Sequence, residues 1–317
     1  MFDITAIGEA LIDLTQTGLS ASGVAEYAAC PGGAPANLAV AAAKLGASTA
    51  FIGRVGTDAF GTQLRECLRA NGVDVSRMLT DAQRPTTLAV VSLDSRGERS
   101  FSFYRQHSAD LALSPDDVPD EALRSTHFFH FGGVSLTANP ARDTVLDAAR
   151  RARNLGACVT YDPNYRPALW GSRAEAVTQL ARPLPLVDIL KVSDEEMALL
   201  TGTDNLRDGS AALADAGIPL VLVTLGAKGV FYRFRGETGI VDGVPCVVAD
   251  TNGAGDTFFG AFLSRMRAFT LDSLTIPQLR DMLGYANRAA SWTTSRSGAN
   301  LGIRGDFIYS PVVFSGS

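Results

Sequence analysis

Cysteine and histidine are scarce in this sequence. Its 317 residues include four cysteines and three histidines, and no two cysteines form a Cys-x-x-Cys pair. Zinc and iron–sulfur sites are built mainly from clusters of these residues, so a metal centre of that kind is not expected. We interpret the scattered cysteines as reduced thiols. Two of the histidines, His127 and His130, fall in an aromatic run that alternates as a strand does, which favours packing over catalysis.

A strong excess of charge of either sign is also missing. The chain carries 28 Lys and Arg against 33 Asp and Glu, a net charge of −5. This weakly acidic balance provides no basic surface for nucleic acid or for an anionic membrane. The first four residues include an acid where a signal peptide would carry Lys or Arg, and the apolar run 219–225 is too short to span a bilayer. We therefore expect a soluble, cytoplasmic protein that binds small molecules.

Two common nucleotide-binding motifs are absent. The sequence has no Gly-x4-Gly-Lys-Ser/Thr segment, and no Gly-x-Gly-x-x-Gly follows a strand near the N-terminus. P-loop ATPases use the first motif and dinucleotide-dependent dehydrogenases use the second, so both classes are disfavoured. A glycine turn at 226–229 follows the strand-like run 220–225 and would let a nucleotide approach the backbone. That pattern is weak alone, because an ordinary turn explains it too.

What the sequence does contain is an alternation of short strand-like and longer helix-like segments. With 46% apolar residues, the chain can bury a large core. Strand-like runs occur at 4–7, 128–131, 158–161, 189–192 and 220–225. Helical patterns occur at 35–45, 60–70, 144–154, 207–216 and 255–266. This alternation predicts an α/β fold with a central, mostly parallel sheet flanked by helices on both faces. No linker is evident, so residues 1–317 are expected to form a single domain.

One stretch interrupts this alternation. Residues 86–94 and 99–105 resemble two strands joined by a turn at 95–98, with no helix between them. With a segment after the first strand, they predict a small β-sheet lid built from about 14–30 and 86–107. Such an appendage covers a site or forms a dimer contact. An exposed edge strand in the lid would allow a homodimer.

The most informative segment lies at residues 250–258. Gly253, Ala254 and Gly255 can turn their backbone N–H groups toward a common point, and the helical pattern that follows places them at a helix N-terminus. Unpaired N–H groups and the positive end of the helix dipole make this an anion site. The carboxylate of Asp256 would repel an anion there, unless it caps the helix or acts as a general base for an attacking hydroxyl. Spacing alone leaves both roles open.

A second polar cluster is predicted near the N-terminus. Asp13 follows the first strand, and Gly32 and Gly33 lead into an Ala-rich helix that carries Asn37. Polar side chains at strand ends suit a polyhydroxylated ligand. A turn followed by a helix start would explain the two glycines without any ligand.

Together, these segments resemble the signatures of the ribokinase-like (PfkB) carbohydrate kinases. The Gly-Gly-x-Pro-x-Asn segment at 32–37 and the Gly-Ala-Gly-Asp-Thr-Phe segment at 253–258 occur in the order typical of the family, and the resemblance covers about residues 3–299. It implies a ribokinase-like fold with a small β-sheet lid. It also implies transfer of the γ-phosphate of ATP to a sugar hydroxymethyl group, with Asp256 as the general base and the preceding amides stabilising the phosphoryl charge.

The resemblance assigns further residues to the two substrates. Those that match sugar-side positions are Asp13, Gly32, Gly33 and Asn37. Those expected on the ATP side are Lys191, Thr224, Gly226, Gly229 and Asn287. Glu196 matches a glutamate that supports Mg²⁺ through water, although Ser193 stands where the family has asparagine.

Within the family, the sequence is most similar to fructokinases, which convert D-fructose to fructose 6-phosphate. The similarity lies in the segments 99–105, 108–110, 162–166, 169–170 and 191–196. Tyr104 and Arg105 end a lid strand and, with Arg166, are expected at the sugar. The 2-keto-3-deoxygluconate kinases share these arginines, which there can bind a carboxylate, so that substrate stays an alternative. A catalytically silent sugar sensor is a further alternative of another class.

The C-terminal segment departs from the family pattern. After Ala299 the family continues with an Ile-Pro-rich stretch, whereas this chain has an apolar, aromatic tail. In the family this region borders the adenine and a monovalent-cation loop. ATP and Mg²⁺ are the expected cosubstrate and metal, and dependence on K⁺ stays open.

Overall fold

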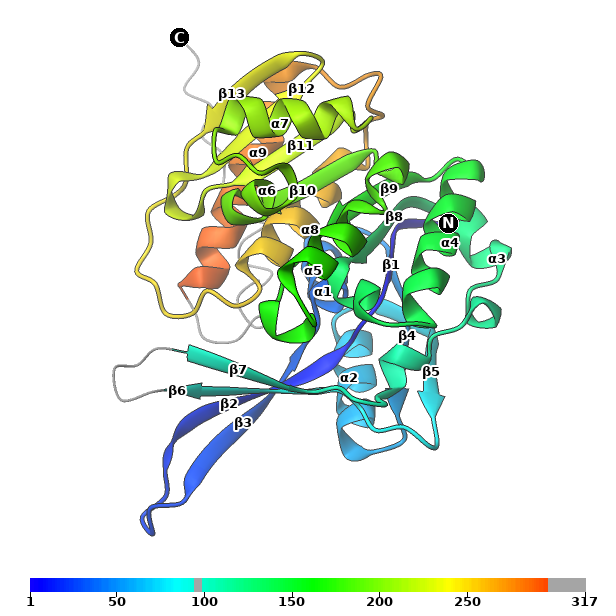
Figure 1. The fold of residues 1–317 in the computed structure, drawn as a ribbon, viewed down its shortest axis with the longest axis vertical. Helices are drawn as coiled ribbons and strands as arrows, with labels where there is room; N and C mark the ends of the chain where they lie inside the picture. Colours follow the sequence, from blue (N-terminus) through cyan, green and yellow to red (C-terminus); the bar gives the residue numbers. More distant parts are fainter. Residues whose placement is uncertain (94–98, 296–317) are drawn as a thin grey trace.

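A nine-stranded sheet forms the centre of the protein (Figure 1). The structure, a computed structural model, describes residues 1–93 and 99–295. The order of the strands across the sheet is β13-β12-β11-β10-β9-β8-β1-β4-β5. The strands are β1 (Phe2–Ile7), β4 (Thr49–Gly56), β5 (Val73–Asp81), β8 (Thr126–Gly132), β9 (Cys158–Asp162), β10 (Ile189–Ser193), β11 (Leu220–Thr224), β12 (Val230–Phe234) and β13 (Glu237–Val241). Neighbours pair in parallel except at β11–β12 and β12–β13, which confirms the predicted mostly parallel sheet.

Helices cover both faces of this sheet (Figure 1). One face packs against α1 (Ala34–Lys44), α2 (Ala59–Ala70), α8 (Ala254–Met266) and α9 (Ile276–Thr294). The other face packs against α3 (Asp120–Arg124), α4 (Ala141–Asn154), α5 (Arg173–Ala181), α6 (Asp194–Thr201) and α7 (Leu206–Asp215). Short 3₁₀ turns lie between these elements, at η1 (Ala109–Ala112), η2 (Pro115–Asp117), η3 (Gly133–Thr137), η4 (Pro167–Leu169), η5 (Leu184–Leu186) and η6 (Gly226–Lys228).

The strand sequences explain why helices cover both faces. In β11 the side chains of Leu220 and Leu222 enter the core beneath α8 and α9, whereas Val221 and Val223 enter the opposite core. Successive side chains of a strand point to opposite faces, so an uninterrupted apolar run needs cover on both. Each predicted strand or helix agrees with the observed one to within three residues at either end.

A separate four-stranded sheet stands off the main sheet (Figure 1). Its order is β3-β2-β6-β7, with β2 and β6 parallel and the two outer pairs antiparallel. The strands are β2 (Leu11–Leu19), β3 (Ala25–Gly32), β6 (Leu88–Leu93) and β7 (Arg99–Tyr104). The two segments predicted to build the small sheet lie here, and the predicted turn at 95–98 is outside the described residues.

Two further expectations concern membrane spans and the C-terminal segment. Among the helices of residues 1–93 and 99–295, none is both long and apolar enough to cross a membrane. The C-terminal segment after Ala299 lies beyond the described part of the chain. The N-terminal ends of α1 and α8 meet near the carboxyl ends of the central parallel strands, and they position the candidate site described below.

Candidate active site

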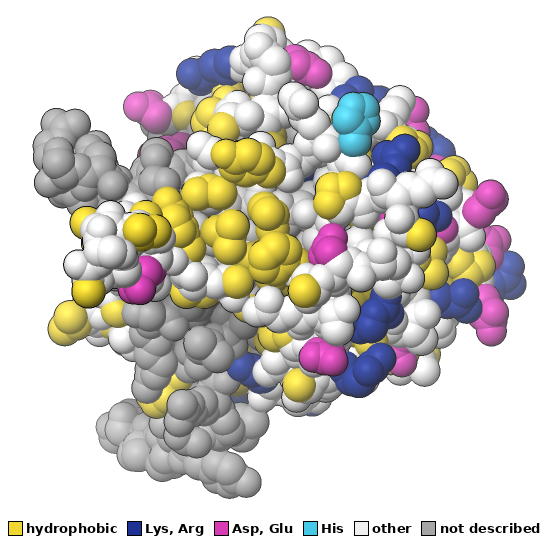
Figure 2. Space-filling model, turned by 90° about the horizontal axis from the view of Figure 1, so that it is seen from below, with side chains coloured by type: hydrophobic (Ala, Val, Ile, Leu, Met, Phe, Trp, Pro, Cys, Tyr) yellow, Lys and Arg dark blue, Asp and Glu magenta, His cyan; other side chains and the backbone are white. Residues whose placement is uncertain are grey.

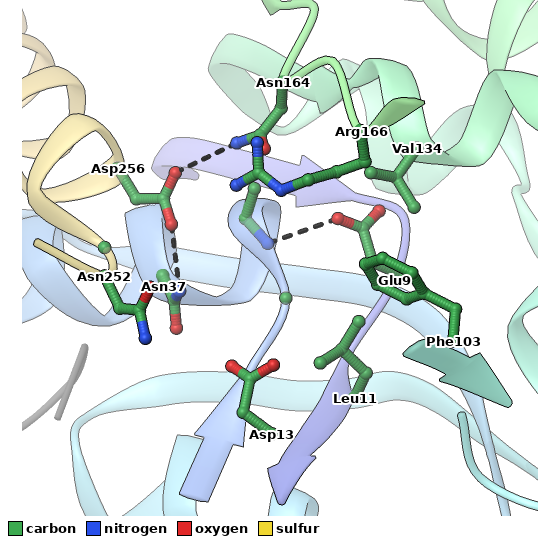
Figure 3. A pocket seen from close by; sticks show the side chains of 13 residues that line it. Glu9, Leu11, Asp13, Asn37, Phe103, Val134, Asn164, Arg166, Asn252 and Asp256 are labelled. Atoms are coloured by element: carbon green, nitrogen blue, oxygen red, sulfur yellow. Dashed lines mark hydrogen bonds between the residues drawn. The ribbon is translucent and has the colours of Figure 1, made fainter. Parts of the chain in front are cut away.

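A cavity lies where α1, α8 and the small sheet meet the carboxyl end of the main sheet (Figure 3). Six residues that the sequence assigned to the site line it: Asp13, Gly33, Asn37, Arg166, Gly253 and Asp256. Four polar or aromatic residues that were not assigned also line it: Glu9, Phe103, Asn164 and Asn252. The cavity therefore joins the two polar clusters that the sequence placed more than 200 residues apart.

The N-terminus of α8 forms one wall of the cavity. Gly253 is the N-cap residue and has φ 71°, a left-handed conformation that favours glycine, and no side chain caps this end of the helix. Ala254 and Gly255 begin the first turn. A Cβ atom on Gly255 would lie 2.9 Å from Nζ of Lys191, so glycine also leaves room for that ammonium group. The first turn of α8 is therefore uncapped, which is the arrangement that the predicted anion site requires.

Asp256 follows in this first turn and is held by two amides. Its Oδ2 accepts a hydrogen bond from Nδ2 of Asn37 (2.9 Å), and its Oδ1 accepts one from Nδ2 of Asn164 (3.3 Å). Burial and the nearby carboxylate of Asp162 raise the pKa of Asp256 to about 6, while the Asn37 hydrogen bond and the cation of Lys191 oppose the rise. The side chain therefore does not cap the helix. It is ionised near neutral pH and faces the cavity, as a general base must.

Asp13 lies at the start of the small sheet, on β2. Burial raises its pKa to about 6, and the guanidinium of Arg166 opposes this rise. Packing explains the glycines opposite it. A Cβ atom on Gly32 would lie 2.4 Å from Oδ2 of Asp13, and one on Gly33 (φ 101°) would lie 2.4 Å from the carbonyl oxygen of Glu9. Gly33 is therefore required by its φ and by its close approach to the backbone, whereas a side chain at position 32 would displace the Asp13 carboxylate, whether or not a ligand contacts these residues.

Glu9 was not assigned to the site, yet it lines the cavity and is only 1% exposed. Its Oε1 accepts a hydrogen bond from the backbone N–H of Ala34, the first residue of α1 (3.2 Å), and its Oε2 accepts one from Oγ of Ser135 (3.3 Å). Burial raises its pKa to about 7. The sequence shows a carboxylate at the end of the first strand, but it does not show that this carboxylate caps a helix 25 residues later.

The structure places Tyr104 and Arg105 differently from the expectation. Tyr104 is 67% exposed and lies outside the cavity lining, where Phe103 is found instead. Arg105 is 5% exposed and also lies outside the lining. Its Nε and Nη2 contact Oδ2 of Asp110 at 2.8 and 2.7 Å, and its Nη1 donates to Oγ1 of Thr137 at 2.5 Å. Arg105 is thus a buried ion-pair partner behind the cavity wall.

The residues expected on the ATP side lie within β10, at the end of β11, in the turn after β11 and on α9, outside the cavity lining. Nζ of Lys191 donates to Oδ2 of Asp162 at 2.8 Å, and Thr224 ends β11. Gly226 and Gly229 have φ values of 58° and 99°. Asn287 donates from Nδ2 to the carbonyl oxygens of Val241 (3.1 Å) and Asp242 (2.9 Å), which ties α9 to the end of β13.

Glu196 and Ser193 form a capping box at the N-terminus of α6. Oε2 of Glu196 accepts the backbone N–H of Ser193 (2.8 Å), and Oε1 accepts that of Tyr165 (2.7 Å). Burial and the charge of Asp162 raise the pKa of Glu196. Within residues 1–93 and 99–295, no cluster of three or more His, Cys, Asp or Glu side chains is arranged to hold a metal ion.

Comparisons of the sequence and of the structure with known proteins identify the family of this chain. Residues 1–304 match the family described as pfkB family carbohydrate kinase. The probable fructokinase-4 of Arabidopsis thaliana is 41% identical over 93% of this chain and 92% of that protein. The ATP-bound fructokinase structure from Xylella fastidiosa superposes with a TM-score of 0.89 at 31% identity, covering 97% of both chains. The Vibrio cholerae O395 fructokinase bound to fructose, ADP and calcium gives 0.86 at 35% identity, covering 95% of both. The chain therefore belongs to the pfkB family of carbohydrate kinases.

Proposed function

We propose that this chain transfers the γ-phosphate of ATP to the hydroxymethyl group of D-fructose, giving fructose 6-phosphate and ADP. The observation that carries the proposal is the placement of Asp256, a buried carboxylate beside the uncapped N-terminus of α8, facing a cavity that Asp13 and Asn37 also line. The names of the relatives support fructose as the acceptor, and the Vibrio cholerae structure holds fructose and ADP together.

In the proposed reaction, the hydroxymethyl oxygen forms a bond to the γ-phosphorus as the bond from that phosphorus to the ADP oxygen breaks. The Asp256 carboxylate takes the hydroxyl proton, a contribution of about 10²- to 10⁴-fold in rate. Backbone N–H groups of Gly253, Ala254 and Gly255 are proposed to stabilise the charge that develops on the phosphoryl oxygens, and losing one such donor typically costs about 10²-fold or more. In this structure the N–H of Ala254 donates to the carbonyl oxygen of Thr251 (3.3 Å), so it would have to turn toward the phosphoryl group when ATP binds. Asp13, Gly32, Gly33 and Asn37 are proposed to orient the sugar.

ATP is proposed to lie on the side of the α8 N-terminus that faces away from the sugar. Lys191 and Thr224 lie on β10 and β11, and β9 and β8 separate these strands from β1, which leads to Asp13. Gly226 and Gly229 provide the turn after β11, and Asn287 borders it from α9. This arrangement would bring the γ-phosphate toward the first turn of α8 from the side opposite the sugar.

Magnesium, when bound, would neutralise charge on the phosphates of ATP. The carboxylate of Glu196 already accepts one backbone N–H on each oxygen, so its remaining lone pairs suit a bound water better than direct ligation. Mg²⁺ keeps several waters when it is held mainly by substrate phosphates, which fits this donor set. Faster turnover in K⁺ than in Na⁺ would add a monovalent cation to the cofactors.

Residues 1–317 are proposed to form one cytoplasmic kinase domain in which β2, β3, β6 and β7 act as a lid and join two chains in a homodimer. Large apolar side chains are exposed on this sheet and its turn: Leu19, Val24, Tyr27 and Tyr104. Figure 2, seen from the side of this sheet, shows hydrophobic side chains gathered there. Light scattering after size exclusion should give a mass of twice 33.4 kDa, the mass of one chain. The Tyr27→Glu variant should have the mass of a single chain. A wild-type mass of one chain would contradict the dimer.

ADP release with Mg²⁺-ATP tests the function directly. The acceptors are fructose, ribose, tagatose, adenosine and 2-keto-3-deoxygluconate, and Asp256→Asn serves as the matched inactive control. Turnover with fructose at the highest kcat/KM supports the proposal. Turnover with the keto acid alone would keep the mechanism and change the substrate, and the exposed guanidinium of Arg166 in the cavity lining would then be its carboxylate partner. Sugar binding without turnover on any acceptor would indicate a sensor.

A further inference from the structure

The carboxylate of Asp256 is fixed from two directions. Asn37 reaches Oδ2 from α1, and Asn164 reaches Oδ1 from the loop after β9 (Figure 3). The three residues are only 7–8% exposed. Because each carboxylate oxygen has its own amide donor, the plane of the carboxylate is set by α1 and by the β9 loop together. The resemblance to the family assigned Asn37 to the sugar, but no role was assigned to Asn164.

The backbone of Asn164 is itself held in an uncommon conformation. Its φ of 44° lies in the left-handed region, which asparagine tolerates better than other residues with a Cβ. Oδ1 of Asp162 accepts the backbone N–H of Asn164 (3.1 Å), and Oδ2 accepts Nζ of Lys191 (2.8 Å). The ion pair of Asp162 and Lys191 is more than nine-tenths buried. It therefore anchors the turn that aims the Asn164 amide at Asp256.

We propose that Asn164 is a positioning residue for phosphoryl transfer: its side-chain amide holds the Asp256 carboxylate in plane and in its ionised form, and the buried pair of Asp162 and Lys191 holds Asn164 in place. This inference rests on the proposed function, because it assumes that Asp256 is the base. A carboxylate held by two donors keeps a fixed lone-pair direction toward the attacking hydroxyl, and proton transfer depends on that geometry.

Several charges act on this carboxylate from the elements packed around it. Asp162, at the end of β9, and Asp13, on β2, disfavour the ionised form, whereas Lys191, on β10, and Arg166, in the loop after β9, favour it. Burial adds to the cost of the charge, and the pKa of Asp256 is raised to about 6. The Asn37 hydrogen bond offsets part of that cost. The amide of Asn164, which contacts the other carboxylate oxygen, should act in the same direction, so removing it should raise the pKa further.

Two substitutions separate the side chain from the backbone of the turn. Asn164→Gly removes the amide but adopts positive φ readily, whereas Asn164→Ala removes the amide and strains the turn. If the amide matters, both variants should lose about 10- to 100-fold in kcat, because a hydrogen bond to a charged group is lost. KM for fructose and for ATP should stay within about threefold. The alanine variant should have a lower Tm than the glycine variant, because it alone strains the turn. A kcat of Asn164→Gly within about threefold of wild type would overturn the proposal, and so would a loss confined to Asn164→Ala.

The titration of Asp256 gives a readout that needs no turnover. Protein labelled with ¹³C at its aspartate carboxyl groups is titrated by NMR, and the Asp256 signal is identified by its absence in Asp256→Asn. We expect a higher midpoint in Asn164→Gly than in wild type. An unchanged midpoint would overturn the inference about Asn164 even if fructose is phosphorylated. A raised midpoint in a protein that phosphorylates none of the acceptors would support the hold of Asn164 on the Asp256 carboxylate and refute the proposed function.

Discussion

Glu9 offers a quantitative test of the electrostatics around the cavity. Its carboxyl group is buried at the end of β1 and accepts hydrogen bonds from the backbone of Ala34 and the hydroxyl of Ser135. Burial raises its pKa from 4.5 to about 7. The charge of Arg105 opposes this rise only in part, because that guanidinium is already paired with Asp110. Replacing Glu9 by glutamine removes the charge and keeps an acceptor for Ala34 and a donor toward Ser135.

The sign of the effect follows from proton linkage. Glu9 binds its proton more tightly in the folded chain, so the stability it contributes is fully present below pH 4.5 and is lost as the pH rises through about 7. The two pKa values differ by about 2.5, and each pKa unit corresponds to about 1.4 kcal/mol, which gives about 3 kcal/mol in total. Of this, about 2.5 kcal/mol is lost between pH 5 and pH 8. Glutamine does not titrate, so the free energy of unfolding of Glu9→Gln does not fall for this reason.

Urea unfolding at pH 5 and at pH 8 measures the difference. Relative to wild type, the free energy of unfolding of Glu9→Gln should rise by about 2.5 kcal/mol from the lower pH to the higher one. Other titrating groups cancel, because they are common to both proteins. Glu195→Gln, at an exposed position on α6, is the matched control and should stay within about 0.5 kcal/mol of wild type at both pH values. An equal difference between Glu9→Gln and wild type at both pH values would refute the reasoning.

Four further predictions concern the site and its support. Asp256→Asn should lower kcat for fructose by about 10²- to 10⁴-fold while calorimetry still detects ATP binding, and near-normal turnover would remove its role as base. The kcat of wild type should rise with pH through about 6, because the base must be ionised; a flat profile from pH 5 to pH 8 would contradict this. Asp13→Ala should raise KM for fructose far more than KM for ATP, and equal increases would contradict two separate binding sides. Arg105→Ala should lower the free energy of unfolding by about 3–5 kcal/mol, since it leaves Asp110 buried without its cation, and a loss below about 1 kcal/mol would show that the pair is dispensable.

Most of the main sheet could be predicted from local pattern. β8 to β11 are short apolar runs, and such runs in a chain that alternates with helices indicate buried strands of a parallel sheet. β4, β5, β12 and β13 were not predicted. In β5, Val73, Val75 and Met78 are buried but the residues between them are partly or fully exposed, as expected for an edge strand with a polar side. A weak alternation of this kind does not stand out from a loop until the neighbouring strand is known.

The candidate site could be predicted only as separate pieces. The sequence placed Asp256 at a helix N-terminus and Asn37 in a glycine-rich helix start, and the structure joins them by a hydrogen bond between residues 219 apart. Asn164 reaches the same carboxylate from 92 residues away. Pairings over such separations follow from the order of strands across the sheet. No local spacing encodes them, so the partner that fixes the base could not be found from the sequence.

The end of β7 shows what elementary strand geometry could have added. Successive side chains of a strand point to opposite faces, so Tyr104 and Arg105 could not both have faced the sugar. In the structure Phe103 lines the cavity, Tyr104 points outward, and Arg105 lies behind the wall with Asp110. Because the charge of Arg105 is already matched there, Arg166 is the arginine that an anionic acceptor would meet in the cavity lining. We therefore expect the discrimination between a neutral sugar and a sugar acid to depend on Arg166, and Arg105 to act on the stability of the cavity wall.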